Sequence, residues 1–547
     1  MVAARSALRA VFVACVLLSA GVVAGGYATH SPTATASEPT APGPNATESP
    51  KGNPGAPGAV ASSATGAASA GSSAGQSSSE ARPSGITVVT TDSNQLLLGL
   101  ANDSRAEAEI VAYGRNGSVQ YYNASHDRYW DVDPVIGEDT ESANGMNETN
   151  EAERANEANG ASGTTDADSM TVEYAASDRL NASACELDEV NEGDAGEGND
   201  DDGNAVCARN VIERVNLTTG AVTRVYSEIA PRADFAPWND VDRINDTHYI
   251  VADRNENRVF VVDTRTGEYA WEWYAASAFR FDSGGYYMED WTHLNDVEYT
   301  EEGRIMASLR NHDQVVFLDP TRPPAGALVT KRTLGADNNR TVLYEQYNPD
   351  YIPSENGGPA ILAADAENNR VVEYAYRNGS WHRSWEWTDE SLQWPRDADR
   401  LPNGHTLVVD SNGDRVLEVD RSGEVVWNLS VGLPYDAERL GTGPESASGP
   451  SAGRIAARTD SEGDPANGGD DPANPPETDP LADALKGVLS GPALSTVLYL
   501  SPRWMGITEL LALCVLVVSA LCWFLAESYW RSVFADLRDR AERVDRR

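Results

Sequence analysis

A unit that recurs through the middle of the chain constrains the fold more than any other sequence feature. The stretch NDVDRINDTHYIVADRNENRVFVVDTRTGEYAWEW begins at Asn239 and returns as RDADRLPNGHTLVVDSNGDRVLEVDRSGEVVWNL from Arg396. Each copy alternates short β-rich runs with turn signals such as PNG and RSGE, which is typical of four antiparallel strands. A period of about 40 to 55 residues with four strands per unit indicates a β-propeller, whose blades bury their faces against their neighbours.

The first strand of each unit begins with an aspartate, and these aspartates predict six blades. They are Asp131, Asp240, Asp296, Asp350, Asp397 and Asp436. The last strand runs directly into a polar stretch, so we expect strands beginning near Ser84 and Glu107 to complete its blade and close the ring. The sequence therefore predicts an all-β, six-bladed propeller over 85–445, with acidic inserts near 137–168 and 186–206.

Two apolar runs frame this propeller and predict its relation to a membrane. Residues 1–30 fit a signal peptide or an N-terminal transmembrane anchor, and 507–530 fit a transmembrane helix. The tail 531–547 is rich in arginine and is therefore predicted to be cytoplasmic, which places the propeller outside the cell.

The segments between the propeller and the apolar runs have compositions of their own. Residues 31–84 are rich in Ser, Ala, Gly and Pro, and 446–481 are acidic and poor in apolar residues, so both are predicted to be disordered stalks. Residues 482–506 form a membrane-proximal segment that is apolar enough to lie on the membrane surface.

Cysteines and glycosylation signals agree with an extracellular domain. Cys185 and Cys207 are the cysteines outside the apolar runs, and they flank a polar acidic loop. A disulfide between them is expected in an oxidising compartment. Asn-x-Ser/Thr acceptors recur along the chain, which indicates a glycoprotein.

Charge narrows the choice of partners and habitat. The 547 residues include 84 acidic and 42 basic side chains, a formal net charge of −42, and Lys51, Lys331 and Lys486 are the only lysines. Nucleic acid is excluded as a partner because no basic cluster stands outside the C-terminal tail. An acidic, lysine-poor surface indicates a protein of a halophilic archaeon, and an acidic but otherwise ordinary protein is the alternative.

The residues that break the repeat are the candidates for function. The repeated aspartates are expected to fix blade geometry, with a role in ligand chemistry as the alternative. His293 and Asn295 precede Asp296, and Arg310 follows one strand later; together they can cradle a tetrahedral oxyanion. The alternative is that His293 and Asn295 cap a loop and Arg310 pairs with an acid. No His/Asp cluster shows metal-ligand spacing, and no cofactor is expected.

The repeat, the H-x-N of His293 and Asn295, and the S-x-R that ends at Arg310 resemble the arylsulfotransferase family, in a membrane-anchored, halophilic archaeal form. The resemblance implies a secreted six-bladed propeller that moves a sulfuryl group between phenols, without a nucleotide sulfate donor, through a sulfated histidine. It assigns sulfate binding to His293, Asn295 and Arg310. At the position of the family's nucleophilic histidine this chain has Tyr347, whose sulfate ester would turn over slowly.

Two functions therefore stay open. The first is an arylsulfotransferase-like enzyme with His293 and Tyr347 as catalytic residues and with Asn295 and Arg310 binding an aryl sulfate or another small anionic or phenolic ligand. The second is a non-catalytic cell-surface propeller that binds an anion or a related ligand. In both, the terminal helices attach the chain to the membrane.

Overall fold

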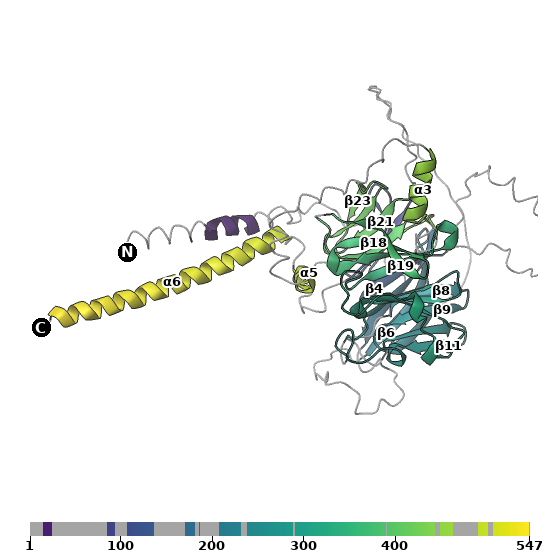
Figure 1. The fold of residues 1–547 in the computed structure, drawn as a ribbon, viewed down its shortest axis with the longest axis horizontal. Helices are drawn as coiled ribbons and strands as arrows, with labels where there is room; N and C mark the ends of the chain where they lie inside the picture. Colours follow the sequence, from purple (N-terminus) through teal and green to yellow (C-terminus); the bar gives the residue numbers. More distant parts are fainter. Residues whose placement is uncertain are drawn as a thin grey trace, which may run out of the picture.

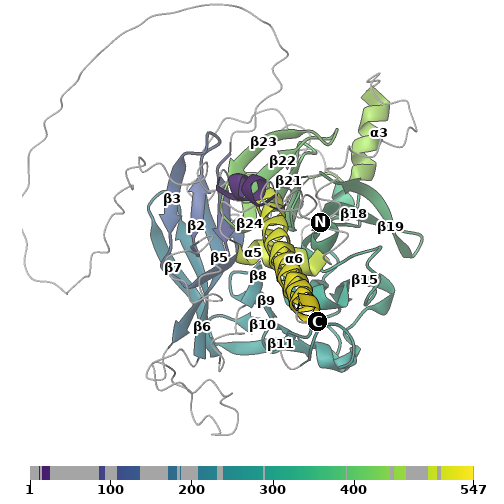
Figure 2. The ribbon, with the colours of Figure 1, turned by 90° about the vertical axis from the view of Figure 1, so that its left-hand side faces the viewer.

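Each predicted repeat forms one four-stranded antiparallel sheet, and six such sheets are arranged in a ring around a central axis, which we call the channel (Figures 1 and 2). The structure, a computed structural model, describes residues 12, 15–24, 85–92, 107–135, 170–180, 185, 207–230, 238–287, 290–389, 391–443, 449–462, 491–501 and 507–545. The predicted six-bladed β-propeller is confirmed.

The four strands of each blade follow one another from the channel outward. Blade 1 contains β24 (Pro434–Arg439), β1 (Thr87–Thr91), β2 (Ile110–Tyr113) and β3 (Val119–Asn123), and blade 2 contains β4 (Arg128–Pro134), β5 (Thr171–Leu180), β6 (Cys207–Asn216) and β7 (Ala221–Ala230). Blade 3 contains β8 (Trp238–Asn245), β9 (His248–Asp253), β10 (Arg258–Asp263) and β11 (Glu268–Tyr274), and blade 4 contains β12 (Leu294–Tyr299), β13 (Ile305–Leu309), β14 (Gln314–Leu318) and β15 (Leu334–Gly335). Blade 5 contains β16 (Tyr347–Ile352), β17 (Ala360–Asp365), β18 (Arg370–Arg377) and β19 (Ser380–Trp387), and blade 6 contains β20 (Pro395–Arg400), β21 (Thr406–Asp410), β22 (Arg415–Val419) and β23 (Val425–Ser430).

Short 3-10 helices interrupt the loops of blades 3 to 5. They are η2 (Ala275–Ser277), η3 (Arg310–His312), η4 (Pro324–Gly326), η5 (Thr330–Arg332), η6 (Ser354–Asn356) and η7 (Ala366–Asn368). Two of them, η3 and η7, carry residues of the candidate site or its surroundings.

Blade 1 closes the ring in the predicted way. Its innermost strand β24 comes from the end of the domain and pairs antiparallel with β1, which comes from the beginning. This pairing joins the two ends of the propeller through backbone hydrogen bonds, so the ring is closed between its first and last strands.

The six repeated aspartates lie on the innermost strands around the channel, and we call them the ring aspartates; all are buried except Asp296, which is partly buried. Three of them reach the next blade: the carboxylate of Asp436 accepts a hydrogen bond from the Val132 amide at 2.8 Å, that of Asp131 from Val241 at 3.3 Å, and that of Asp240 from Val297. At these three positions the repeated aspartate therefore fixes one blade to the next, as the sequence predicts.

Burial changes the protonation of the channel carboxyls. Burial, with the charges of Asp242 and Asp436, raises the pKa of Asp240 to about 8. Burial raises the pKa of Asp436 to about 6, although hydrogen bonds to its carboxylate oppose the shift. A second layer of acidic side chains lies two residues further along most of the same strands, on the same face, and burial raises the pKa of its member Asp242 to about 6. At neutral pH the channel therefore holds part of its carboxyl groups in the protonated form.

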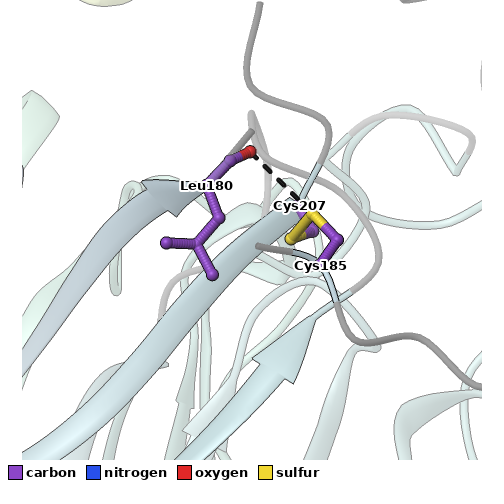
Figure 3. The surroundings of a disulfide bond; sticks show 3 residues. All are labelled: Leu180, Cys185 and Cys207. Atoms are coloured by element: carbon purple, nitrogen blue, oxygen red, sulfur yellow. Dashed lines mark hydrogen bonds between the residues drawn. A yellow bond between two sulfur atoms is a disulfide. The ribbon is translucent and has the colours of Figure 1, made fainter. Parts of the chain in front are cut away.

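The predicted disulfide is confirmed. Cys185 and Cys207 are joined by an S–S bond of 2.01 Å beside the paired ends of β5 and β6, near Leu180 (Figure 3). The acidic insert predicted at 186–206 lies between the two cysteines and, like that at 137–168, falls outside the described residues.

One prediction for the flanking segments is wrong in part. The sequence predicts a disordered stalk over 446–481, yet within it α3 (Ala452–Glu462) packs beside blade 5. The Ser451 amide donates to the Asn356 carbonyl at 2.9 Å, and the Ala452 amide donates to the Glu373 carboxylate at 2.9 Å. These backbone bonds to the propeller order a stretch whose composition alone indicates no structure. The stalk predicted at 31–84 lies outside the described residues.

The C-terminal region contains α5 (Gly491–Leu500) and the long helix α6 (Ile507–Asp545), which leads away from the propeller (Figure 1). In the described part of the chain, one helix is long and apolar enough to cross a membrane, over Glu509–Ala535 with a mean hydropathy of 2.4. Near the N-terminus a shorter apolar helix spans Cys15–Ala24. A signal peptide or anchor over 1–30 therefore stays a prediction.

Candidate functional site

The candidate site lies at one mouth of the channel, where the chain enters the innermost strands. His293, Tyr347 and Trp394 occupy the same place in three consecutive blades, each three residues before a ring aspartate. A β-bulge separates this place from the aspartate in all three blades, and His293 and Trp394 have left-handed φ angles of 46° and 59°. A bulge turns side chains away from the regular strand direction, so these three rings gather at the mouth.

His293 connects an acid to Tyr347. Its Nδ1 lies 2.6 Å from Oδ2 of Asp290, and its Nε2 lies 3.2 Å from the hydroxyl of Tyr347. Asp290 is held in turn by the guanidinium of Arg254, with both nitrogen–oxygen distances at 3.0 Å. The three residues form a continuous chain of hydrogen bonds, Asp290–His293–Tyr347, which we call the relay.

The electrostatics fix the direction of these bonds. Burial and the charges of Arg254 and Arg310 lower the pKa of His293 to about 3, so its ring is neutral at ordinary pH. Burial opposes ionisation of Asp290, but its charged surroundings, including Arg254, outweigh burial and lower its pKa well below the usual range. An ionised carboxylate only accepts, so Nδ1 of His293 carries the proton, and Nε2 accepts from the Tyr347 hydroxyl.

Two arginines lie close to the Tyr347 ring. The guanidinium carbons of Arg310 and Arg396 each lie 5.2 Å from the ring centroid. Arg396 is buried, the Arg310 side chain is 13% exposed, and Nε of each has no hydrogen-bond partner. Two positive charges next to a phenol ring attract an anion.

These arginines are also paired with carboxylates. Arg310 forms an ion pair with Glu345 and donates to the amide oxygen of Asn311 at 2.7 Å, while Arg396 donates to Asp92 at 2.9 Å. An incoming anion therefore has to share or replace these partners.

Asn295 lies in the same strand as the site but contacts the neighbouring blade. Its amide nitrogen donates to the carbonyl of Gln346 at 3.0 Å, and its oxygen is buried without a partner. Gln346 precedes Tyr347, so in this structure Asn295 positions the backbone that carries the tyrosine. His293, Tyr347 and Arg310 are thus brought together, whereas Asn295 contacts the backbone of Gln346 next to them.

Blade 4 supplies His293 and Arg310, and it lacks an ion pair that blades 3, 5 and 6 have in common. In those three blades the pair joins the end of the second strand to the start of the third. In those blades an arginine Nε contacts an aspartate, in Arg258–Asp253 at 2.8 Å, Arg370–Asp365 at 2.6 Å and Arg415–Asp410 at 2.7 Å. Blade 4 has Leu309 and Gln314 at the equivalent paired positions. Blade 4 therefore departs from the repeat both at the site residues and at the neighbouring strand pair Leu309–Gln314.

Sequence reasoning missed several members of the site. Asp290 stands in a loop without repeat character, and nothing marks it before the fold places it beside His293. Arg254 carried a signal, because it occupies in blade 3 the place of Arg310 in blade 4. Arg396 also carried one, since it occupies the place of Asn295, directly before a ring aspartate.

The arrangement suits proton transfer to and from an aryl oxygen beside a bound anion. A neutral imidazole oriented by a carboxylate acts as a general base, and buried guanidinium groups stabilise negative charge on a tetrahedral ester. Among the described residues, no group of three or more His, Cys, Asp or Glu side chains is arranged to hold a metal ion.

Comparisons with known proteins do not identify a family for this chain. No protein-family model and no curated protein matches the chain. Among solved structures, the chain is similar to a Bacteroides caccae protein of unknown function at 9% identity and a TM-score of 0.39, over 66% of this chain and 100% of the other. It is also similar to a periplasmic gluconolactonase of Pseudomonas aeruginosa, at 13% identity and a TM-score of 0.36 over 66% and 99%, and to virginiamycin B lyase of Staphylococcus aureus, at 13% and 0.28 over 47% and 74%. Likeness at this level does not bear on activity.

Proposed function

We propose that the channel mouth is an arylsulfotransferase-like site, which moves a sulfuryl group between phenolic esters. The observation that supports this most is the relay Asp290–His293–Tyr347, with Arg310 and Arg396 close to the tyrosine ring. A phenolic oxygen in hydrogen-bond contact with a base, beside two cations, is what sulfuryl transfer to or from a phenol requires.

The first half of the reaction uses Tyr347 as the nucleophile. Its hydroxyl proton passes to Nε2 of His293 while the phenolic oxygen attacks the sulfur of an aryl sulfate. The bond from sulfur to the aryl oxygen breaks, and the leaving phenolate takes the proton from His293. In the second half, an acceptor phenol gives its proton to His293 and attacks the sulfur on Tyr347, which regains its proton when the ester bond breaks. The sulfated tyrosine is a stable ester, so the second half is slow.

The test is release of p-nitrophenol from p-nitrophenyl sulfate with phenol as acceptor, combined with mass spectrometry of the peptide that contains Tyr347. We expect a slow reaction and a sulfuryl group on Tyr347 when the acceptor is left out. Tyr347→Phe removes both, and Tyr122→Phe, an exposed tyrosine of blade 1, leaves both unchanged. Sulfation that persists in Tyr347→Phe contradicts the proposed nucleophile.

A second function, an anion-binding propeller without transfer chemistry, is favoured by a different observation. Arg254, Arg310 and Arg396 each already contact a carboxylate, which is the pattern of a structural charge network as well as of a binding site. If p-nitrophenyl sulfate binds at the mouth but Tyr347 is never sulfated, this second function holds.

We further propose that the propeller is anchored in a membrane by α6 and faces the outside of the cell. The apolar length of α6, the arginine-rich tail after it and the disulfide support this placement. Protease added to intact cells should remove the propeller and spare the tail 531–547. A tail that is cleaved first contradicts the orientation.

The proposed source is a salt-adapted archaeon, because of the net charge of −42 and the three lysines. Surface repulsion is screened over about 3 Å in 1 M salt and about 10 Å in 0.1 M salt. The melting temperature should therefore fall when salt is lowered from molar to 0.1 M, and an unchanged value contradicts the proposal.

A further inference from the structure

The helix α5, which precedes the membrane-spanning helix, packs on the propeller over the middle of the ring of blades (Figure 2). Ser495, Leu498 and Tyr499 share one face of α5 by their spacing, and the first two are buried. Val497 and Leu500, on the other side, are each 37% exposed. Both faces of α5 therefore carry apolar side chains: Leu498 lies on the propeller, and Val497 and Leu500 lie on the outer face.

Tyr499 inserts its phenol into the channel mouth. Its hydroxyl donates to Oδ2 of Asp92 at 3.1 Å, and its ring meets Trp394 edge to face at a centroid distance of 5.9 Å. The guanidinium carbon of Arg396 lies 5.8 Å from the same ring. These three residues receive both parts of a phenol, the hydroxyl and the ring.

The acceptor of the Tyr499 hydroxyl is held in its charged form. Asp92 accepts from Arg396 at 2.9 Å and also from Arg128. Burial raises the pKa of Asp92, but the charges of Arg128 and Arg396 outweigh burial and hold the pKa below its usual value. A carboxylate fixed in this way binds the hydroxyl of a phenol and does not compete for its proton.

A second contact fastens α5 to other blades. The Ser495 hydroxyl donates to Glu367 in η7 of blade 5 at 3.1 Å, and the Ser495 carbonyl accepts from Asn412 of blade 6 at 3.2 Å. Together with Asp92 from blade 1, these contacts spread α5 across three blades.

Tyr499 and Tyr347 share their neighbours. Trp394 lies 5.8 Å from the Tyr347 ring and 5.9 Å from the Tyr499 ring, and Arg396 lies 5.2 Å from the first and 5.8 Å from the second. Tyr499 therefore lies against the same tryptophan and the same arginine as Tyr347. The aryl part of a ligand that reacts with Tyr347 has these two side chains within reach.

We propose that Asp92, Trp394 and Arg396 form a phenol-binding subsite that the chain's own Tyr499 fills, so that an external phenol enters by displacing α5. When α5 leaves the propeller, it loses its inner contacts. Because α5 precedes α6 in the chain and its outer face is apolar, it can then lie on the membrane surface. The identity of the external ligand rests on the proposed function. The subsite itself rests on the contacts of α5.

The test measures binding of p-nitrophenol to the full chain in lipid nanodiscs by isothermal titration calorimetry. Tyr499→Ala vacates the subsite, and we expect it to bind p-nitrophenol at least about tenfold more tightly than the unchanged chain, because affinity scales with the open fraction. Val497→Ala, on the outer face of α5, is the matched control and should bind as the unchanged chain does. Tyr499→Phe keeps the ring but loses the bond to Asp92, so its affinity should fall between the two.

Hydrogen exchange of residues 491–501 gives an independent readout. Adding p-nitrophenol to the unchanged chain should speed exchange in α5, as Tyr499→Ala does without ligand. Equal p-nitrophenol affinity in the unchanged chain and Tyr499→Ala, or no binding to either, overturns the inference. Tighter binding to Tyr499→Ala without any sulfuryl transfer upholds the subsite and contradicts the transfer chemistry, so the two proposals fail separately.

Discussion

The ring aspartates and the mouth residues that precede them belong to the same innermost strands, yet they follow opposite rules. Asp131, Asp240 and Asp436 repeat one contact, a carboxylate that accepts a backbone amide of the next blade. Three residues earlier, blades 4, 5 and 6 place a histidine, a tyrosine and a tryptophan, and these make different contacts in each blade. In this propeller, a residue that recurs in every blade holds the blades together, whereas one that differs between blades is the candidate for chemistry.

The largest expected effect concerns the mouth residues, and it is a change in the rate of sulfuryl transfer when Tyr347 is replaced. Tyr347→His places an imidazole next to Arg310 and Arg396. Because a neutral imidazole leaves sulfur more easily than a phenolate does, transfer from p-nitrophenyl sulfate to phenol should rise by about two orders of magnitude, the lower end of what a positioned catalytic group contributes. The rate of p-nitrophenol release measures it. A variant that folds, binds the donor and is no faster than the unchanged chain contradicts the role given to Tyr347.

The anion-binding role of Arg310 predicts the next effect. Arg310→Ala should weaken binding of p-nitrophenyl sulfate by about 1.5 to 3 kcal/mol, the range for a hydrogen bond to a charged group. Arg265→Ala removes an exposed arginine of blade 3 that pairs with Asp263, and it serves as the control. Titration calorimetry compares the two, and equal affinities would remove Arg310 from the site.

The ring aspartates should respond in stability and not in binding. Asp240→Ala leaves the Val297 amide without its acceptor inside the channel, at a cost of about 1 to 3 kcal/mol in the free energy of unfolding. Asp240→Asn keeps an acceptor oxygen and should cost less. Denaturant unfolding tests both variants. If Asp240→Ala is as stable as the unchanged chain, the structural role of the ring is wrong.

The pH dependence of stability gives a smaller effect of defined sign. The pKa values of Asp240, Asp242 and Asp436 are raised to about 8, 6 and 6, so the folded chain keeps protons that the unfolded chain has already lost. The contribution of these three carboxyls to the free energy of unfolding is present in full below the unfolded pKa near 3.8, and it is lost as pH rises through 6 and 8.

One further group acts in the same direction. His126 lies between Asp178 and Glu213; burial opposes its protonation, but these two acids raise its pKa to about 9, and its stabilisation is lost as pH rises through that value. The melting temperature should therefore fall by several degrees from pH 5 to pH 8, and Asp240→Asn should flatten the slope. A melting temperature that rises over this interval contradicts the raised pKa values.

Much of the fold could be predicted from the sequence, because a blade is a local unit. The leading aspartates, the turn signals and the period place the six innermost strands, and the lone strand at Asp436 requires closure by the first strands of the domain. The pairing of Cys185 with Cys207 followed from having two cysteines outside the apolar runs. All these inferences use information that lies within one repeat or one loop.

The site could be predicted only in part. His293, Tyr347 and Arg310 stand out because they interrupt an alignment of blades, and the structure brings them together. Asp290 and Asp92 are ordinary acids in an acidic chain. The conformation of one loop places Asp290 beside His293, and the closed ring places Asp92 beside Arg396. Tyr499 lies outside the repeat altogether, more than sixty residues beyond the ring aspartate Asp436. Its contact with Asp92 depends on the packing of α5 against the propeller, which no repeat pattern encodes.

The most direct test of the channel mouth as the functional site is a structure of the full chain determined with p-nitrophenyl sulfate. We predict the sulfate group within hydrogen-bond distance of Arg310 and the Tyr347 hydroxyl, with the nitrophenyl ring beside Trp394 in the place that Tyr499 leaves. A ligand bound elsewhere on the propeller, with the relay and α5 unchanged, would contradict the assignment of the channel mouth as the functional site.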